Sequence, residues 1–238
     1  MTSAFLHPAE VHHSHRDVTG GWLRPAVFGV MDGLVSNASL IAGVMGSGAS
    51  ISAVAIAGLA GLAAGAFSMA TGEYTSVRSQ TEMILAEIAV ERREIARNPE
   101  AEERELALLY ESRGLTPKLA RDVARQLHAH DEVAWRVHAR EELGVDPDDL
   151  PSPWVAAGSS FLAFALGALI PLLPFLLGFG SVLAAAALTA AGLFGTGALV
   201  ARLTRRSAVF GGARQLLLGA TAAAVTYEIG HLVGAIIS

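Results

Sequence analysis

The chain has 238 residues, of which 52% are hydrophobic and 16% charged, and it contains no cysteine. Its mean hydropathy of +0.45 is too high for an ordinary soluble domain. The lack of cysteine excludes disulfides, thiolate metal sites and iron–sulfur clusters. The net charge of −5 and the lack of a concentrated basic face argue against nucleic acid as a partner.

Charged residues are concentrated in one part of the chain. Residues 73–149 hold 29 of the 39, of which 18 are acidic and 11 basic. Asp32 is the only charge between Pro25 and Gly72, and there is none between Pro151 and Ala201. This distribution excludes both a water-soluble protein and an intrinsically disordered one.

Five stretches are long and apolar enough to cross a membrane. A helix needs about 20 apolar residues, at about 1.5 Å each, to cross a hydrocarbon core of roughly 30 Å. We expect the spans at approximately Pro25–Val44, Ile51–Thr71, Val155–Leu177, Ser181–Leu203 and Leu216–Ile237. The predicted fold is therefore an all-α membrane protein with five transmembrane helices.

The topology follows from the arginines. The first twenty residues lack an apolar core, so we expect no signal peptide and a cytoplasmic amino terminus. Arginines precede the first span, follow the second and follow the fourth, so five spans place every arginine cluster in the cytoplasm and the carboxy terminus outside. The missing targeting segment and the arginine-rich composition favour a bacterial plasma membrane.

The charged segment is predicted to be a cytoplasmic helical domain, residues 78–150, inserted between the second and third spans. Residues 1–24 then form a cytoplasmic segment, residues 25–77 the first two spans and residues 151–238 the last three. Asn98-Pro99, Gly114, Thr116-Pro117 and Gly144 are typical of helix starts and stops. They predict three helices: one up to Arg97, one over Pro99–Arg113 and one over Pro117–Leu143.

The first predicted span carries a face of small and polar residues. At helical spacing these are Gly29, Asp32, Gly33, Ser36, Asn37 and Gly43. A carboxylate inside a membrane costs roughly 2.5–3.5 kcal/mol on insertion scales, so Asp32 should face a partner, a cavity or an ion. The alternative is a protonated Asp32 that hydrogen-bonds to a neighbouring helix. We favour the functional interpretation.

The second span repeats small or ligand-bearing residues every four positions. These are Gly61, Gly65, Met69 and Glu73. Small residues permit close helix packing. A lone Met69 is more typical of core packing, but it lies one turn from Glu73 on a face that can approach Asp32.

The charged segment pairs glutamates three residues apart, Glu91 with Glu94 and Glu102 with Glu105. Such pairs project from one helical face, and His138 and Glu142 lie near the end of the third predicted helix. Carboxylates with an imidazole suit iron(II) or manganese(II), and zinc(II) or cobalt(II) as well. From spacing alone, a solvated acidic face balanced by arginines is the more probable interpretation.

Two weaker signals remain. His12, His13 and His15 form a short tract that could collect metal. Glu228 and His231 form one E-x-x-H motif in the last span, which is half of the paired motif of di-iron proteins.

Three stretches resemble the vacuolar iron transporter family, which includes plant, fungal and bacterial members. They are DGLVSNASLIAGVMG from Asp32, GLAAGAFSMATGEYTSVRSQTE over Gly61–Glu82, and GALIPLLPF over Gly167–Phe175. The resemblance covers nearly the whole chain. It implies a five-span homodimer with an ion path at the subunit interface, and exchange of metal for protons.

The resemblance also implies residue roles. In the family, an aspartate and a methionine matching Asp32 and Met69 line the path, and a three-helix insert binds metal. The family's insert glutamates match Glu91, Glu94, Glu102, Glu105 and Glu142, which reverses the preference for a solvated face. Two departures stand out: Gly61 replaces a glutamate found in some members, and His138 and Ala139 replace a methionine pair.

The combined prediction is a transporter, not an enzyme, that moves iron(II), with manganese(II) as a second cargo, out of the cytosol by proton antiport. The predicted transport path is Asp32, Asn37, Met69 and Glu73. The predicted metal-binding residues are Glu91, Glu94, Glu102, Glu105, His138 and Glu142. The expected partners are membrane lipid, a second subunit, protons and divalent metal ions, and no catalytic cofactor is expected.

Two alternatives belong to other functional classes. A membrane-anchored ferritin-like protein would bind or oxidise iron, but such sites use two E-x-x-H motifs within one bundle, and the charged segment has none. A non-transporting membrane adaptor would leave Asp32 without a purpose.

Overall fold

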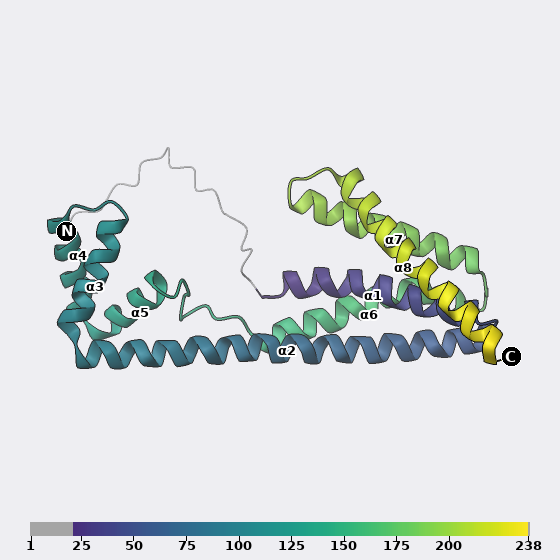
Figure 1. Ribbon diagram of the computed structural model, residues 1–238, viewed down its shortest axis with the longest axis horizontal. Coiled ribbons are helices and arrows are strands. Elements are labelled where there is room, and N and C mark those ends of the chain that lie inside the picture. Colours follow the sequence, from purple (N-terminus) through teal and green to yellow (C-terminus); the bar gives the residue numbers. More distant parts are fainter. Residues whose placement is uncertain (1–20, 238) are drawn as a thin grey trace, which may run out of the picture.

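The computed structural model describes residues 21–237, and within that range all regular structure is helical. The long helix α2 runs the length of the molecule, with helices packed along one half of it and a smaller group at its far end (Figure 1). In chain order the helices are α1 (Leu23–Gly46), α2 (Ile51–Arg97), α3 (Pro99–Ser112), α4 (Pro117–His128), α5 (Asp131–Glu141), α6 (Pro153–Leu176), α7 (Val182–Leu203) and α8 (Ala208–Ile237).

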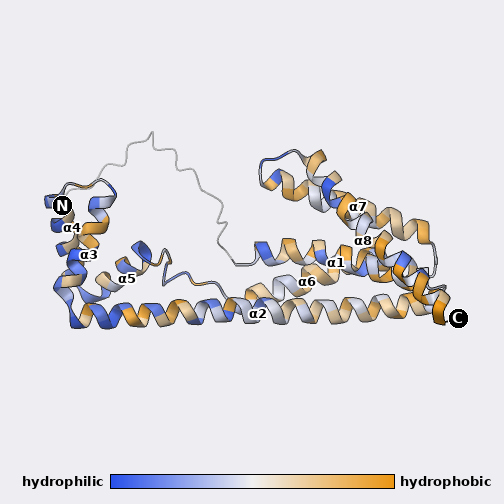
Figure 2. Ribbon diagram, viewed as in Figure 1, coloured by the Kyte–Doolittle hydropathy of each residue, from blue (hydrophilic) through white to orange (hydrophobic). Residues whose placement is uncertain are grey.

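Five of these helices, α1, α2, α6, α7 and α8, are long and apolar enough to cross a membrane, which confirms the predicted number of spans. Apolar residues dominate α1, α6, α7, α8 and the near half of α2, whereas hydrophilic residues are concentrated on α3, α4, α5 and the far half of α2 (Figure 2). We call residues 78–150 the charged helical region. Its amphipathic helices are too short and too polar to span a bilayer.

Helix α2 joins the two parts of the molecule without a break. Its 47 residues extend about 70 Å at about 1.5 Å per residue, more than twice the hydrocarbon thickness. The Ser50 side chain caps its start by accepting a hydrogen bond from the Ala53 amide. Since no glycine or proline interrupts the stretch from Glu73 to Arg97, the predicted second span and first charged helix form one rigid element.

The third predicted helix of the charged region, Pro117–Leu143, is wrong as a single helix. Helix α4 ends at His128 and α5 begins at Asp131, with His130 in an extended conformation between them. The break lets the two halves pack against different partners. Ala124 of α4 packs with Leu106 and Ala107 of α3, whereas α5 packs against α2.

Close glycine contacts hold the membrane-spanning helices together. Helix α1 lies against α6, where a methyl group at Gly33 would stand 2.2 Å from the Phe164 carbonyl oxygen. Helix α1 also lies against α8, where a methyl group at Gly230 would stand 1.8 Å from the Gly43 carbonyl oxygen. Small residues in membrane helices allow such backbone approach. The glycines of the face predicted for the first span are therefore divided between two neighbouring helices: Gly29 and Gly33 face α6, and Gly43 faces α8.

Candidate metal centre

Three side chains of the charged helical region converge on one point. Glu91 comes from α2, His138 from α5, and Glu142 from the residue that caps the end of α5. The Nδ1 atom of His138 lies 2.8 Å from an oxygen of Glu91 and 2.8 Å from an oxygen of Glu142. One ligand atom from each residue lies within 4.8 Å of the other two, so these residues could hold one metal ion.

The packing of α5 on α2 creates this convergence. Ile88 and Ile95 share a face of α2 with Glu91, because residues three and four apart lie on the same side of a helix. Both isoleucines belong to a buried cluster with Trp135 and Ala139 of α5. Arg92 adds a cation–π contact, with its guanidinium carbon 3.9 Å from the centre of the Trp135 ring. Because His138 is next to Ala139 in α5, this packing places its side chain beside Glu91.

The burial of these groups favours a bound cation. His138 is fully buried and Glu91 is 8% exposed. The facing atoms, His138 Nδ1 and the nearer Glu91 oxygen, lie 2.8 Å apart, yet neither has a hydrogen-bond partner. Two ligands at about 2.1 Å from one ion stand about 3 Å apart. The spacing therefore fits metal ligands, and the donor set fits divalent iron, manganese, zinc or cobalt.

Burial also changes the proton affinity of the centre. Desolvation, together with repulsion from neighbouring glutamates, raises the pKa of Glu91 to about 7 and that of Glu142 to about 7. Burial, aided by the nearby His128, lowers the pKa of His138 to about 4. At neutral pH the imidazole is therefore neutral and the two carboxyl groups are partly protonated, so a metal ion binds in competition with protons.

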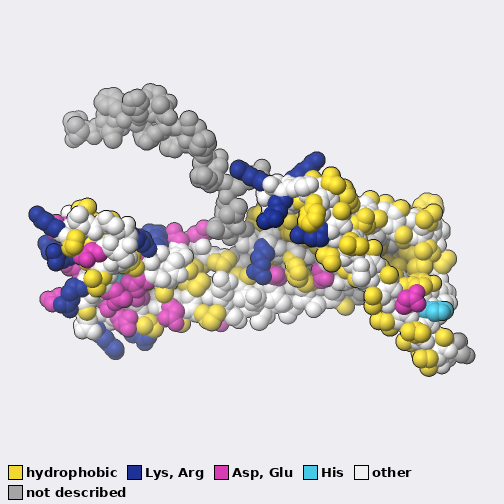
Figure 3. All heavy atoms as spheres, turned by 45° about the horizontal axis from the view of Figure 1, so that its top comes forward, with side chains coloured by type: hydrophobic (Ala, Val, Ile, Leu, Met, Phe, Trp, Pro, Cys, Tyr) yellow, Lys and Arg dark blue, Asp and Glu magenta, His cyan; other side chains and the backbone are white. Residues whose placement is uncertain are grey.

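The other predicted glutamates surround this centre. Glu94, Glu102 and Glu105 are close enough to raise the pKa of both Glu91 and Glu142 by repulsion. Burial and repulsion from Glu105 and Glu94 raise the pKa of Glu102 as well. Acidic side chains gather over this part of the molecule (Figure 3). The structure thus brings all six predicted metal-binding residues together, with three of them at ligand distance.

A second candidate site is a cavity of about 210 Å³ between the spans. Its polar and sulfur-bearing lining comes from Asp32, Ser36, Asn37, Ser68 and Met69, on α1 and α2. The remaining lining residues are Leu40, Gly61, Gly65 and Phe164. Three of the four residues predicted for the transport path therefore face one cavity.

The amide of Asn37 is aimed into this cavity. Asn37 is 2% exposed, and its nitrogen donates a 2.6 Å hydrogen bond to the Ala168 carbonyl of α6. Its buried oxygen has no partner and lies 2.9 Å from where a methyl group at Gly61 would stand. Since Gly61 and Asn37 both line the cavity, a ligand or water held there would lie beside an unpaired acceptor.

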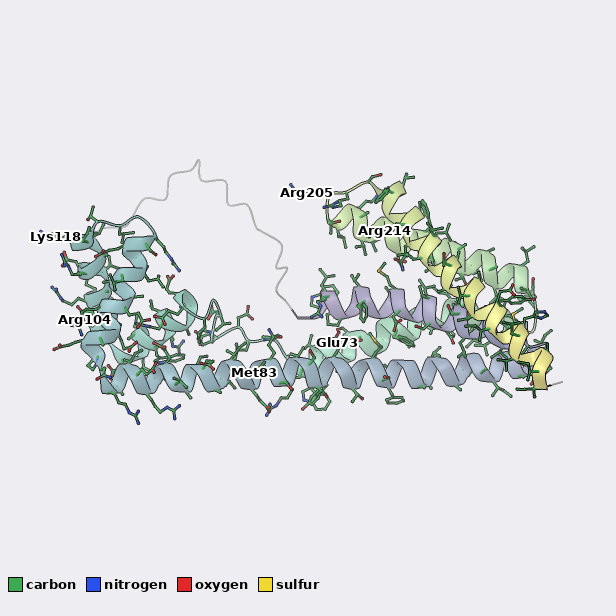
Figure 4. The ribbon with its side chains drawn as sticks, in the orientation of Figure 1. Glu73, Met83, Arg104, Lys118, Arg205 and Arg214 are labelled. Atoms are coloured by element: carbon green, nitrogen blue, oxygen red, sulfur yellow. The ribbon has the colours of Figure 1, made fainter. Side chains whose placement is uncertain are left out.

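Asp32 and Glu73 occupy different settings. Asp32 accepts a 2.6 Å hydrogen bond from the Ser36 hydroxyl, one turn along α1. Glu73 lies one turn beyond Met69 on α2, outside the cavity lining and nearer the charged region (Figure 4). The structure therefore places Glu73 between the intramembrane cavity and the metal centre, not in either of them.

Sequence reasoning missed His128. Its Nε2 atom lies 2.8 Å from Nε2 of His138, although the two residues are ten apart. In one continuous helix they would stand about 15 Å apart along the axis. Because the residues from Pro117 to Leu143 include no glycine or internal proline, nothing in the sequence marked the break that brings these rings together.

The weaker sequence signals gain little support. Glu228 and His231 are both exposed on α8, and the metal-ligand group found among residues 21–237 does not include them. The tract His12, His13 and His15 lies outside the described residues.

Comparison with known proteins places the chain in one family. The profile of the VIT family matches residues 23–231, a range that contains the charged region and part or all of every candidate span. The chain belongs to the VIT family.

Several relatives within the VIT family carry informative names. A vacuolar iron transporter of Acanthamoeba castellanii is 45% identical over 170 residues, which cover 71% of this chain and 61% of that protein. Vacuolar iron transporter 1 of Arabidopsis thaliana is 31% identical over 226 residues, 93% of this chain and 90% of the relative. Vacuolar iron transporter homolog 1 of Oryza sativa subsp. japonica is 35% identical over 219 residues, which cover 90% of this chain and 74% of that protein.

VIT family membership confirms the resemblance found in the sequence. It also confirms the expectation of a transporter in place of an enzyme, at the level of the family, since these relatives are named as transporters. The all-helical architecture with five candidate spans agrees. The roles of individual residues, the direction of transport and the oligomeric state stay predictions.

Proposed function

We propose that this protein transports divalent metal, iron(II) first and manganese(II) second, out of the cytosol in exchange for protons. The observation that carries the proposal is the cavity between the spans, where a carboxylate, a thioether and an unpaired amide oxygen meet: Asp32, Met69 and Asn37. Such groups are costly inside a membrane and typically mark an ion path. The names of the relatives support iron as the cargo.

The metal centre captures the ion before it enters the membrane. Glu91, His138 and Glu142 bind it directly, and Glu94, Glu102 and Glu105 raise the local metal concentration by their negative charge. Zinc(II) and cobalt(II) satisfy the same donor set. Glu73 then receives the ion at the mouth of the path, and Met69, Asp32 and Asn37 bind it between the spans.

Proton exchange follows from the same carboxylates. A metal ion binds a deprotonated carboxylate, so its arrival releases protons, and protons arriving from the far side displace the metal. Each subunit contributes one carboxylate, Asp32, with neutral partners to the membrane site, so each subunit exchanges at most one proton per cycle directly on Asp32.

The arrangement of the helices supports an amino terminus inside and a carboxy terminus outside. The start of α1, the start of α6 and the turn between α7 and α8 all point toward the charged region (Figure 1). The carboxy end of α8 lies at the opposite end, beside the start of α2. We therefore place Arg24, Arg78, Arg202 and Arg205 on one side of the membrane, in agreement with the positive-inside rule. We place that side in the cytosol of a bacterial cell.

A homodimer completes the proposed path. The cavity is bounded by α1, α2 and α6 of one chain, and the exposed residues Ser36, Leu40 and Ser68 at its rim would face the second subunit.

The test is anaerobic iron(II) flux into proteoliposomes with a proton gradient, comparing the intact protein with Asp32→Asn. The substitution keeps the shape of the side chain and removes the charge. We expect flux to fall at least tenfold, while Glu228→Gln, an equally conservative change in an exposed residue of α8, leaves it unchanged. Equal flux in the intact protein and Asp32→Asn would remove Asp32 from the path.

The ferritin-like alternative gains no support from the metal centre, which combines two carboxylates with a single imidazole. Oxygen consumption on addition of iron(II) to the purified protein separates the two functions. We expect no rate above that of the uncatalysed reaction.

A further inference from the structure

His128 and His138 form a contact that the proposed transport function does not use. Their Nε2 atoms are 2.8 Å apart, their ring centres 5.0 Å apart, and the ring planes are inclined by 73°. Nitrogen atoms at this distance are hydrogen-bonded, so one Nε2 carries the hydrogen and the other accepts it. The choice of donor determines whether Nδ1 of His138 can bind a metal ion or can only donate a hydrogen bond.

The two arrangements have different consequences for the metal centre. If His138 donates from Nε2, its Nδ1 bears a lone pair that faces Glu91 and Glu142, as a metal ligand must. If His128 donates, the hydrogen of His138 lies on Nδ1, and the imidazole becomes a hydrogen-bond donor to the carboxylates. An Nδ1–H would have the carboxylate oxygens of Glu91 and Glu142 each at 2.8 Å, yet Nδ1 forms a hydrogen bond with neither. The geometry favours donation by His138.

We propose that His128 is a positioning residue for metal binding: it accepts the Nε2 hydrogen of His138 and so keeps the Nδ1 lone pair directed at the metal. This inference rests on the proposed metal centre at Glu91, His138 and Glu142. Histidine ligands generally donate their second ring nitrogen to an acceptor, which fixes the ring and its tautomer. Here the acceptor is a second histidine, brought into place by the break between α4 and α5.

The surroundings of His128 fit this role. It is the last residue of α4 and is partly buried, and Leu127 beside it packs onto the cluster of Leu106, Ala107 and Ala124. That packing holds the imidazole in place without involving it in the metal centre. His138 itself is fully buried, so no water competes with His128 for its Nε2 hydrogen.

The test uses full-length protein in detergent and cobalt(II), which is stable in air and reports its coordination by visible absorption. We expect His128→Leu to weaken cobalt(II) affinity about 10–100-fold and to change the absorption spectrum. His128→Gln supplies an amide oxygen as acceptor and should restore most of the affinity. His130→Leu, which removes an exposed imidazole two residues away, is the matched control and should bind as the parent does.

A second measurement reads the tautomer itself. Nitrogen-15 spectra of histidine-labelled, metal-free protein, with His138→Ala identifying the His138 signals, should show hydrogen on Nε2 and none on Nδ1. Hydrogen on Nδ1 in the intact protein would overturn the inference whatever the variants show.

The controls separate this inference from the proposed function. If His138→Ala abolishes cobalt(II) binding while His128→Leu binds like the parent, His128 has no positioning role and the metal centre stands. If His138→Ala also binds like the parent, the metal centre itself is wrong, and the inference about His128 is wrong with it.

Discussion

Glu91 and Glu142 are the residues whose chemistry is most changed by folding. Burial and the surrounding negative charge raise the pKa of each to about 7 from an ordinary value of 4.5. The unfolded chain would hold these protons only below about pH 5. The folded metal-free protein therefore exchanges protons at the centre near neutral pH.

Metal binding should therefore depend steeply on pH around neutrality. Between pH 8 and pH 6 the two carboxyl groups take up protons that a metal ion must displace, so affinity should fall as pH is lowered across that window. His138, with a pKa lowered to about 4, contributes no competing proton there. Calorimetric titration of the full-length protein with cobalt(II) at several pH values measures this. An affinity that stays constant from pH 8 to pH 6 would contradict the role of the carboxylates.

The same pKa values predict a conflict between metal binding and stability. Because the folded pKa of Glu91 lies above its unfolded value, the metal-free protein loses stability as pH rises from about 4.5 to about 7 and does not regain it above that. Glutamine carries no charge, so we expect Glu91→Gln to raise the free energy of unfolding at pH 8 by up to about 3 kcal/mol. The lowered pKa of His138 has the opposite effect: it makes the protein lose stability as pH falls from about 6.5 to about 4.

Thermal unfolding of the metal-free parent and Glu91→Gln proteins at pH 8 and pH 5 measures this difference. The variant should be the more stable at pH 8, the gap should shrink at pH 5, and the variant should bind cobalt(II) more weakly. Lower stability of Glu91→Gln at pH 8 would show that the carboxylate holds the charged region together.

Among the elements, the contact between α1 and α8 depends on backbone approach. A methyl group at Gly230 would stand 1.8 Å from the Gly43 carbonyl oxygen, whereas one at Gly72 of α2 would meet nothing within 4 Å. We expect Gly230→Ala to destabilise the protein by about 1–3 kcal/mol through overpacking. Gly72→Ala, also within a helix, should be neutral or stabilising by up to about 1 kcal/mol.

Thermal denaturation of the detergent-purified variants, followed by circular dichroism, compares the two alanine substitutions directly. If both change the midpoint equally, α1 and α8 do not pack through these glycines. The pair is matched because each change adds one methyl group to a helical glycine.

How far the sequence predicts these elements depends on the kind of signal each carries. The five spans were predictable because apolar length is a local property, and the ends at Arg97 and Ser112 because proline and glycine mark them locally. The break after His128 could not be predicted, because the segment contains no glycine or internal proline. The turn forms because α4 packs on α3 while α5 packs on α2.

The candidate sites show the same division. Spacing placed Asp32, Asn37 and Met69 on faces that could meet, and the fold brings them to one cavity. Spacing alone could not show that Glu91 and Glu142 are the glutamates at ligand distance from His138. The distances between these side chains depend on how α5 packs on α2. The contact of His128 with His138 could not be predicted either, because it also depends on how the helices pack.

For the whole molecule, the central claim is that one rigid helix connects a metal-capturing centre to an intramembrane path. Helix α2 carries Glu91 of the centre and Met69 of the cavity, 22 positions apart in the sequence and about 33 Å along the helix axis. Glu73 lies between them. In the proposed function, the ion passes from the charged region to the cavity along α2, and protons move in the opposite direction.

The most direct test records both movements at once. Proteoliposomes holding a pH-sensitive dye and an iron(II)-sensitive dye, with no imposed proton gradient, receive iron(II) outside under anaerobic conditions. The account predicts that iron(II) enters and protons leave together, that both movements require the carboxylate of Asp32, and that an imposed gradient, acidic inside, accelerates uptake. Iron(II) entry with no proton movement, and no response to the gradient, would contradict exchange and leave a passive path.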